Sequence, residues 1–278
     1  MSKKNKLRTG LVFSGGASRG WAFIGVLKAL EEANIKIDYI GGSSMGALLA
    51  AVYASGRFSV DEMIDIACSF HKKDIFSVYG FLRARGGVTS IHRTRRRFLK
   101  KLYPPDLDFK DLKIPLFING LDMKTGKHHI ITKGSVLDAV SIAISFPGVF
   151  EPIKVGNKLM VDGGGINHCM VDVLKEHSDF VIASYIVHET DCERFTAFNK
   201  YKLAEKLFLN ELIKMTLNKH KPDFCLVPKI TGQPDFAYNR KTCEFCIKEG
   251  RKVTEANIEK LKKAIQEKNE RLSDRTGA

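Results

Sequence analysis

Short apolar runs alternate with amphipathic stretches along most of the chain. The runs at 9–14 and 37–43 hold few residues and end in serine, which predicts short buried strands. Each is followed by a stretch, 19–35 or 44–56, in which apolar residues recur at helical spacing. Strands that alternate with helices predict an α/β fold, in which helices cover both faces of a central, mostly parallel sheet. We therefore expect a three-layer α/β/α sandwich.

The same alternation continues towards the C-terminal end of the chain. Further helices are predicted over 60–70, 135–146, 195–219 and 238–265, and further strands over 114–122, 127–132, 179–187 and 223–230. A hairpin over 150–164 turns at Gly156 and Asn157. No internal repeat or long Pro/Gly-rich linker divides the chain, so we expect one domain over residues 1–278, frayed at about 1–6 and 272–278.

The composition is that of a globular protein, with 44% hydrophobic and 27% charged residues among 278. No run of 18 apolar residues is present, and the basic N-terminal stretch lacks the apolar core of a signal peptide. We expect a cytoplasmic protein, with peripheral contact to a membrane as a second option. The six cysteines are scattered, which suits free thiols in a reducing compartment. Only Cys243 and Cys246 form a CxxC pair; without a second pair for zinc, core packing is the favoured interpretation.

The net charge of +14 is unevenly distributed, because residues 81–101 hold eight arginines and lysines and no acidic residue. Such a cluster suits nucleic acid, an anionic lipid surface or an acidic partner. The alternative is a solvated helix that Ile91, Phe98 and Leu102 dock on the core. Aromatic residues are sparse in this segment and no nucleic-acid motif is present, so we expect no nucleic-acid partner.

Two adjacent serines lie in the stretch GGSSMG, between a predicted strand and a predicted helix. A nucleophile elbow needs glycine two residues before and two residues after the reactive serine, because the turn is too tight for a β-carbon there. Gly42 and Gly46 satisfy this spacing around Ser44, whereas Ser43 would have a methionine at one of the two positions. Ser44 is therefore the candidate nucleophile; the alternative is a Gly-Ser turn that only caps the helix.

Two further glycine-rich turns could complete such a site. The stretch FSGGASRGWAF exposes backbone N–H groups before a helix, which suits an oxyanion or a phosphate. It is neither a Walker A motif nor a GxGxxG motif. Asp162 ends a predicted strand and precedes three glycines, so it is either a catalytic carboxylate at the sheet edge or a turn cap. His168 lies close to Asp162 in sequence, but an isolated histidine near a turn is usually incidental.

Taken together, these segments resemble the patatin-like phospholipase family over most of the chain. The matching stretches are FSGGASRGWAFIGVLKALEE, GGSSMGALLAA, AISFPGVFEPI and VDGGGINHCMVDVL, in that order. The resemblance implies the patatin-like fold and hydrolysis of lipid acyl esters by a Ser-Asp dyad, without catalytic histidine, metal or cofactor. Two positions depart from the family pattern: Ala17 stands where many relatives have glycine, and Met170 where they often have proline.

Carried over by position, the resemblance implies that Ser44 is the nucleophile and Asp162 the general base. The amides of Gly15, Gly16 and Ala17 would form the oxyanion hole, and Arg19 would hold that loop or a lipid phosphate. Gly42, Gly46, Gly163 and Gly164 would support the turns. On this basis Asp162→Asn should abolish turnover, whereas replacement of His168 should matter little.

We therefore expect a serine acyl hydrolase of phospholipase A or lysophospholipase type. The alternatives are a thioesterase or small-ester esterase, and a non-hydrolytic lipid-binding protein on the same fold. A lipid substrate would give the basic segment a partner, an anionic bilayer surface. The residues expected to face it are Arg93, Arg96, Arg97, Lys100 and Lys101.

Overall fold

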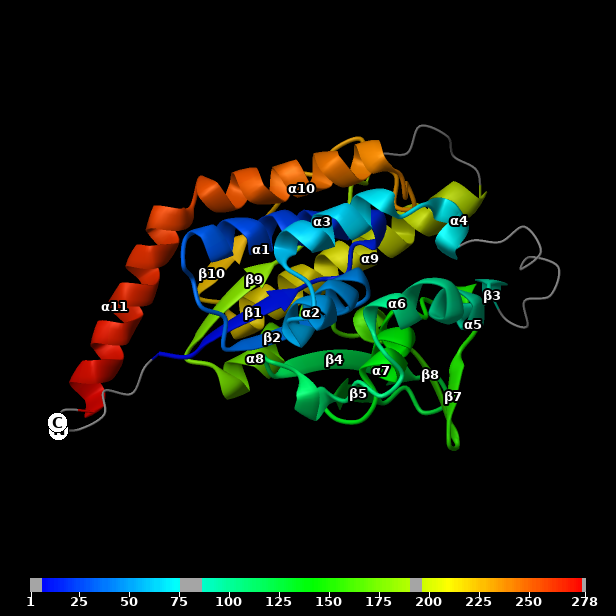
Figure 1. Ribbon diagram of the computed structural model, residues 1–278, viewed down its shortest axis with the longest axis horizontal. Coiled ribbons are helices and arrows are strands. Elements are labelled where there is room, and N and C mark those ends of the chain that lie inside the picture. Colours follow the sequence, from blue (N-terminus) through cyan, green and yellow to red (C-terminus); the bar gives the residue numbers. More distant parts are fainter. Residues whose placement is uncertain (1–6, 76–86, 191–196, 277–278) are drawn as a thin grey trace.

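The computed structural model describes residues 7–75, 87–190 and 197–276, and its centre is a mostly parallel sheet (Figure 1). The spatial strand order is β10-β9-β1-β2-β4-β8-β7, with β5 also paired to β4. The parallel strands are β1 (Thr9–Phe13), β2 (Tyr39–Gly42), β4 (Leu116–Asp122), β9 (Phe180–Ser184) and β10 (Phe224–Leu226). The antiparallel part comprises β5 (His128–Ile131), β7 (Ile153–Val155) and β8 (Lys158–Asp162), and Gly156 lies in the turn between β7 and β8 as predicted.

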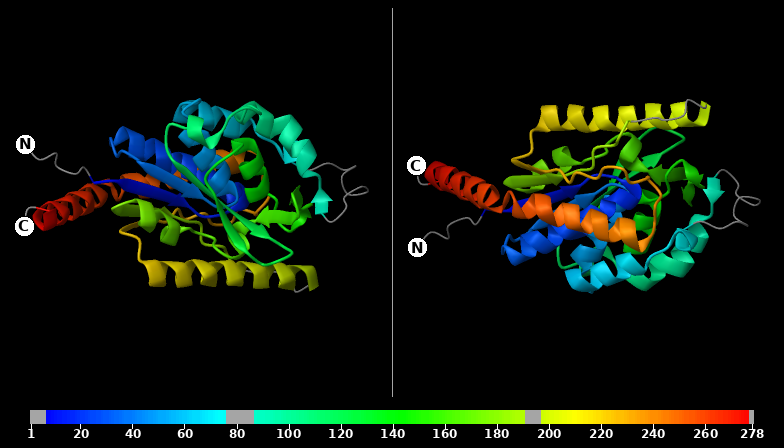
Figure 2. Two further views of the ribbon diagram at one scale, coloured as in Figure 1. Left: turned by 90° about the horizontal axis from the view of Figure 1, so that it is seen from below. Right: turned by 90° about the horizontal axis from the view of Figure 1, so that it is seen from above.

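Helices cover both faces of this sheet, which confirms the predicted three layers (Figure 2). On one face lie α1 (Ala22–Glu32), α2 (Met45–Ser55) and α7 (Val136–Ala143), with α3 (Val60–Ser69) and α10 (Arg240–Glu255) packed against α1. On the other face lie α8 (Val171–His177) and, outside it, the long helix α9 (Ala197–His220). None of the helices in the described ranges combines the length and the apolar composition needed to cross a bilayer.

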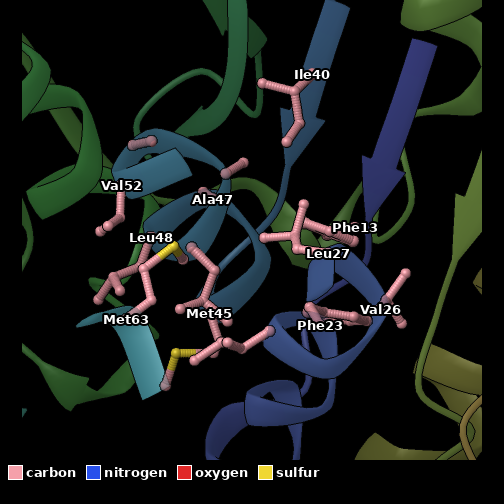
Figure 3. Packing of buried hydrophobic residues seen from close by; sticks show 14 of the residues in the cluster. Phe13, Phe23, Val26, Leu27, Ile40, Met45, Ala47, Leu48, Val52 and Met63 are labelled. Atoms are coloured by element: carbon pink, nitrogen blue, oxygen red, sulfur yellow. The ribbon is translucent and has the colours of Figure 1, made fainter. Parts of the chain in front are cut away.

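Helix α2 lies at the centre of the larger hydrophobic core. Apart from Tyr53, all of its residues are buried, because the sheet covers one side and the helices α1 and α7 cover others. Figure 3 shows Met45 and Leu48 of α2 beside Met63 of α3, near Phe13 of β1 and Leu27 of α1. A helix enclosed in this way needs no polar face, which explains why its sequence is apolar all round.

Helices α1 and α10 approach closely enough for their backbones to touch. A β-carbon on Gly25 would lie 1.9 Å from the carbonyl oxygen of Ile247, and one on Gly250 would lie 1.9 Å from that of Ala22. Only glycine fits at either position. The C-terminal part of the chain is thus packed directly on the helix that follows the first glycine-rich turn.

The predicted C-terminal helix is in fact two helices, α10 and α11 (Ile258–Thr276), and α11 continues beyond residue 272, where a frayed end was expected. Cys243 and Cys246 of α10 are buried in the core, with the Sγ of Cys243 3.5 Å from that of Cys68. Burial raises the pKa of both thiols, so they are protonated and unreactive at neutral pH. Core packing, the favoured interpretation of the CxxC pair, agrees with this arrangement.

The basic segment is helical from residue 91, as predicted, but its middle turn is π-helical and not α-helical. It consists of α5 (Ile91–Thr94), a π-helical turn (Arg95–Leu99) and α6 (Lys100–Leu102). Ile91 and Leu102 are buried and Phe98 packs on the core; the π-helical turn buries Leu99 as well. Residues 81–86 of the segment, with Arg83 and Arg85, lie outside the described residues.

Several short elements were not predicted from the sequence. β3 (Gly87–Thr89) pairs in parallel with β6 (Gly148–Phe150) as a separate two-stranded sheet. A short helix α4 (Lys72–Ile75) follows α3, and 3-10 turns form at Ala17–Trp21, Phe109–Asp111 and Gly163–Gly165. The 3-10 turn at 163–165 follows β8 directly, the one at 17–21 begins four residues after β1 ends, and both belong to the candidate site.

Candidate active site

Strand register brings the predicted site residues to one edge of the sheet. Phe13 at the end of β1 pairs with Gly42 at the end of β2, and Gly42 pairs with Ile118 of β4. Two residues further along β4, Gly120 pairs with Asp162 of β8. Ser44 lies two residues beyond Gly42, so Ser44 and Asp162 reach the same level although 118 residues separate them in sequence. The first glycine-rich turn leaves β1 at that level too.

Ser44 has the strained backbone of a nucleophile elbow. Its φ of +52° and ψ of −123° are unfavourable for a residue with a β-carbon, and such strain is typical of functional sites. A β-carbon on Gly42 would lie 2.3 Å from the carbonyl carbon of Gly46, and one on Gly46 would lie 2.4 Å from the carbonyl oxygen of Ser14. Both glycines are therefore required by close contacts, which is the physical reason for the spacing in the sequence.

Asp162 is 2% exposed and lies at the turn that follows β8. Its Oδ1 accepts a hydrogen bond from the N–H of Gly164 at 2.8 Å, whereas its Oδ2 has no hydrogen-bond partner among the described residues. Burial raises the pKa of Asp162 to about 7, against the smaller opposite effects of the Gly164 amide and the neighbouring Ser44 hydroxyl. A carboxylate with that pKa is a competent general base at neutral pH.

Two of the three glycines in this turn, Gly163 and Gly164, are needed for packing. A β-carbon on Gly163 would lie 2.8 Å from Cγ of Asn119, and one on Gly164 would lie 2.9 Å from Oγ of Ser43. Asn119 itself is buried on β4, and its Nδ2 donates to the carbonyl oxygen of Asn167 at 2.7 Å. Asn119 was not predicted as a site residue, although a polar residue inside an apolar strand is a recognisable signal.

The first glycine-rich turn offers fewer free amides than the sequence predicted. The N–H of Gly15 donates to the carbonyl oxygen of His168 at 3.2 Å, so it is not available to an oxyanion. No acceptor within the described part of the chain engages the N–H groups of Gly16 and Ala17. Met45, the first residue of α2, adds an amide without an intrahelical partner. Of the three amides predicted for an oxyanion hole, those of Gly16 and Ala17 are therefore free, and Met45 adds a further candidate donor.

Ala17 has an unfavourable left-handed backbone conformation in this turn, since its φ is +47°. Replacing Ala17 by glycine is expected to stabilise the fold by up to about 1 kcal/mol, because the left-handed strain outweighs the added entropy of the unfolded chain. Chemical denaturation at equilibrium measures this. Gly126→Ala is the matched control: Gly126 has a φ of +68° and open space around it, so this variant should lose about the same free energy. A destabilised Ala17→Gly would contradict the strain argument.

Arg19 holds the turn rather than presenting its charge to a ligand. The side chain is 1% exposed, and its Nη2 forms an ion pair with Asp235. The adjacent Ser18 donates through its N–H to the carbonyl oxygen of Asp235 and through its Oγ to that of Pro234. Of the two roles expected for Arg19, the geometry fits the holding of the loop and leaves no accessible guanidinium for a lipid phosphate.

Two buried histidines lie beside the site, and one of them was not singled out from the sequence. The ring of His168, expected to be incidental, packs against Gly15, where a β-carbon would lie 2.5 Å from its Cε1. His188 follows β9, at the sheet edge where strands β1 and β2 also end, and that position was a readable signal. Among the described contacts, neither ring forms a hydrogen bond with Ser44 or Asp162, so the Ser-Asp pair remains the candidate dyad.

A cavity of about 320 Å³ opens at this edge of the sheet, and Ser44 and Asp162 both line it. Most of its other walls are apolar or aromatic; they include Trp21, Leu48, Phe70, Phe98, Ile144, Phe146, Phe150 and Tyr238. Gly16 and Ala17 line it beside Ser44. In the described ranges no three His, Cys, Asp or Glu side chains cluster as metal ligands would. The arrangement places the hydroxyl of Ser44, the buried carboxyl of Asp162 and free backbone amides in the wall of an apolar chamber.

Comparison with known proteins gives one family and several relatives. The model of the family described as patatin-like phospholipase matches residues 11–175. The chain is 35% identical over 170 residues to neuropathy target esterase sws of Drosophila melanogaster, which covers 59% of this chain and 12% of that protein. The corresponding protein of Drosophila persimilis is 36% identical over 164 residues. The chain thus spans only about an eighth of the length of these relatives.

Two solved structures share the fold at low sequence identity. Human GIVD cytosolic phospholipase A2 superposes with a TM-score of 0.54 at 8% identity, covering 95% of this chain and 63% of that one. VipD from Legionella pneumophila superposes with a TM-score of 0.51 at 13% identity, covering 94% of this chain and 67% of that one. These two likenesses concern the fold alone.

Proposed function

This chain belongs to the patatin-like phospholipase family, and we propose that it hydrolyses fatty-acyl esters of phospholipids or lysophospholipids through Ser44 and Asp162. The observation that carries the proposal is the cavity wall. There a strained serine and a buried carboxylate with a pKa near 7 lie beside free amides, and the chamber is lined by apolar side chains that suit an acyl chain.

Acylation starts when Ser44 attacks the ester carbonyl. Asp162 accepts the hydroxyl proton as the bond from Oγ to the carbonyl carbon forms. The carbonyl oxygen becomes an oxyanion, which the amides of Gly16 and Ala17 stabilise, helped by the positive end of the α2 dipole. When the intermediate collapses, the bond to the leaving alcohol breaks and Asp162 returns its proton to that oxygen.

Deacylation repeats these steps with water. Asp162 removes a proton from the water molecule, the hydroxide adds to the acyl carbonyl, and the same amides stabilise the second oxyanion. Collapse then breaks the bond to Oγ, and Asp162 hands its proton back to Ser44. Because Oδ1 stays bonded to the Gly164 amide, the unpartnered Oδ2 is the oxygen that carries the proton in both halves.

The substrate class is tested by measuring products from three kinds of substrate. Phospholipid and lysophospholipid vesicles should release free fatty acid, and p-nitrophenyl esters should react faster as the acyl chain lengthens, because the chamber is apolar. Preference for acyl thioesters or for acetate esters would instead identify a thioesterase or a small-ester esterase. A fluorophosphonate probe that labels no residue of the wild-type protein would identify a non-hydrolytic lipid-binding protein.

The basic helical segment has a place in this proposal, because it borders the chamber. Thr94 and Phe98 of the segment line the cavity, while Arg97, Lys100 and Lys101 are exposed. The side chains of Arg93 and Arg96 lie outside the described residues. We propose that these cations rest on an anionic lipid surface when the chamber receives a substrate.

Removing this charge should weaken membrane binding. A variant with Arg97, Lys100 and Lys101 changed to glutamine is expected to bind vesicles containing phosphatidylserine at least about tenfold less tightly, since each cation near such a surface contributes roughly 1 kcal/mol. Co-sedimentation at low salt measures it. Lys260, Lys262 and Lys263 of α11 provide a control with the same charge change on exposed positions, because α11 extends from the other end of the molecule (Figure 1). Equal loss in both variants would show a general charge effect and contradict the proposal.

A further inference from the structure

A buried chain of hydrogen bonds runs from Arg19 through two histidines to Gly164. Nη2 of Arg19 lies 2.7 Å from Nδ1 of His188, and Nε2 of His188 lies 3.3 Å from Nε2 of His168. Nδ1 of His168 lies 3.2 Å from the carbonyl oxygen of Gly164. The N–H of Gly164 in turn donates to Oδ1 of Asp162 at 2.8 Å. Consecutive contacts therefore connect the guanidinium that holds the first glycine-rich turn with the carboxylate of the second.

The imidazole rings of His168 and His188, which form this row of hydrogen bonds, are both neutral at physiological pH. Burial lowers the pKa of His168 to about 4 and that of His188 to about 2. The cations that face the pair act in the same direction: Arg19 on the turn after β1 opposes protonation of both rings, and Lys206 on α9 opposes protonation of His188. Asp235 faces Arg19 and Lys206, with which it forms ion pairs.

Because both rings are neutral and Arg19 is permanently charged, the positions of the ring protons on His188 and His168 are fixed. Arg19 can only donate, so Nδ1 of His188 is an acceptor and its single proton is on Nε2. That N–H points at Nε2 of His168, which must be an acceptor as well. The proton of His168 is therefore on Nδ1, from which it donates to the carbonyl oxygen of Gly164. No other assignment of two neutral rings avoids two donors or two acceptors facing each other.

We propose that His168 is a positioning residue for the base: held as the Nδ1–H tautomer by His188 and Arg19, it fixes Gly164, whose amide fixes Asp162. Its catalytic consequence rests on the proposed function. The backbone of His168 also accepts the N–H of Gly15, so the same residue sets the distance between the two glycine-rich turns. His168 itself touches none of the reacting atoms in this scheme.

The arrangement explains why the cation is kept away from the base. A guanidinium in contact with Asp162 would lower the pKa of that carboxyl and make it a poorer proton acceptor. Through two neutral imidazoles, Arg19 can order the base loop while burial still holds the pKa of Asp162 near 7. The position of Asp162 is thereby controlled by Arg19 and the two histidines, and its basicity by burial.

The tautomers are measured directly by NMR of the full chain with ¹⁵N-labelled histidine, an experiment that needs no activity. We expect His168 as the Nδ1–H tautomer and His188 as the Nε2–H tautomer. Both should stay unchanged between pH 5.5 and 8.5, an interval that lies above both lowered pKa values. Signals are assigned with His168→Asn and His188→Leu. In His188→Leu, the ¹⁵N signals of His168 should show a mixture of both tautomers instead of one. An imidazolium at either position near pH 6, or the opposite tautomers, would overturn the proposal.

Kinetic measurements on variants of His168 distinguish a positioning role of its N–H from simple packing of its ring. His168→Phe keeps a ring but no N–H, and kcat is expected to fall by about 10- to 100-fold with little change in KM. This loss is larger than the small effect that the family resemblance implies for a replacement of His168. The midpoint of the pH profile of kcat/KM should also move, because the environment of Asp162 changes. His168→Asn retains an N–H that can reach Gly164, so it should recover most of the lost kcat and return the midpoint.

The control is His177→Phe, which replaces a histidine on α8 that stacks on Phe117, away from the chamber. It should leave kcat and the pH midpoint unchanged. Equal rates and unshifted midpoints for His168→Phe and His168→Asn would show that the ring only fills space. If the wild-type protein hydrolyses no ester, the proposed function fails, while the tautomer measurement still decides whether the hydrogen-bond chain exists.

Discussion

Replacing Ser44 by alanine is expected to lower kcat/KM for acyl esters by at least about 10³-fold and to abolish labelling by a fluorophosphonate probe. The reason is chemical: among the described residues, Ser44 is the serine at the predicted nucleophile elbow that lines the chamber together with Asp162. The fold should persist, because alanine keeps the β-carbon and the same strained backbone. Active-site labelling followed by mass spectrometry, together with a fatty-acid release assay, measures both effects.

Ser43→Ala is the matched control for this result. Ser43 is fully buried and its Oγ packs near Gly164, so its hydroxyl has no access to a substrate in the chamber. The variant should still be labelled at position 44. Labelling of Ser44→Ala at Ser43, or equal labelling of wild type and Ser44→Ala, would contradict the assignment of the nucleophile.

Replacing Asp162 by asparagine is expected to reduce kcat by at least about 10³-fold, because asparagine cannot accept the proton of Ser44. In the wild-type protein kcat/KM should fall as the pH drops below about 7, the pKa to which burial raises Asp162. Below that pH the carboxyl is protonated and has no base function. The residual rate of the asparagine variant should lack this dependence, as a pH-rate profile would reveal.

The same substitution should make the protein more stable at alkaline pH. The pKa of Asp162 is raised in the folded state from 3.8 to about 7, so between these values the folded state holds a proton that the unfolded state has lost. Stability therefore falls as the pH rises through this window, and the destabilisation is complete above about pH 7. Asp162→Asn removes it, and should gain stability at pH 8 but not at pH 4.

Denaturant unfolding at the two pH values tests this, with Asp122→Asn as the control. Asp122 is also buried, but its carboxylate accepts hydrogen bonds from Thr125 and from the amides of Lys124 and Leu159. Its replacement should lower stability at pH 8. If both variants lose stability at pH 8, Asp162 is not held with a raised pKa.

The elbow and the general fold could be predicted from the sequence because their causes are local. Short apolar runs define the parallel strands, and the spacing of Gly42 and Gly46 around Ser44 reflects contacts within one tight turn. Asp162 at a strand end was a weaker signal, because its nearness to Ser44 depends on the register of β2, β4 and β8. The resemblance to the family predicted the pairing of Ser44 with Asp162.

Contacts between distant segments could not be predicted in this way. The loss of Gly15 as an oxyanion donor depends on the carbonyl of His168, more than 150 residues away. The ion pair that buries Arg19 depends on Asp235, which lies in a loop without regular pattern. The pairing of β3 with β6 joins two strands of three residues each, too short for any periodicity to be recognised.

The backbone contact between α1 and α10 has a consequence for how the molecule can be divided or synthesised. The family match ends at residue 175, yet α10 begins at Arg240 and covers α1 through Gly25 and Gly250. A fragment cut at the end of the match would leave that face of α1 bare and the guanidinium of Arg19 without Asp235. During translation, the surroundings of the nucleophile elbow can therefore close only after Asp235 and α10 have left the ribosome.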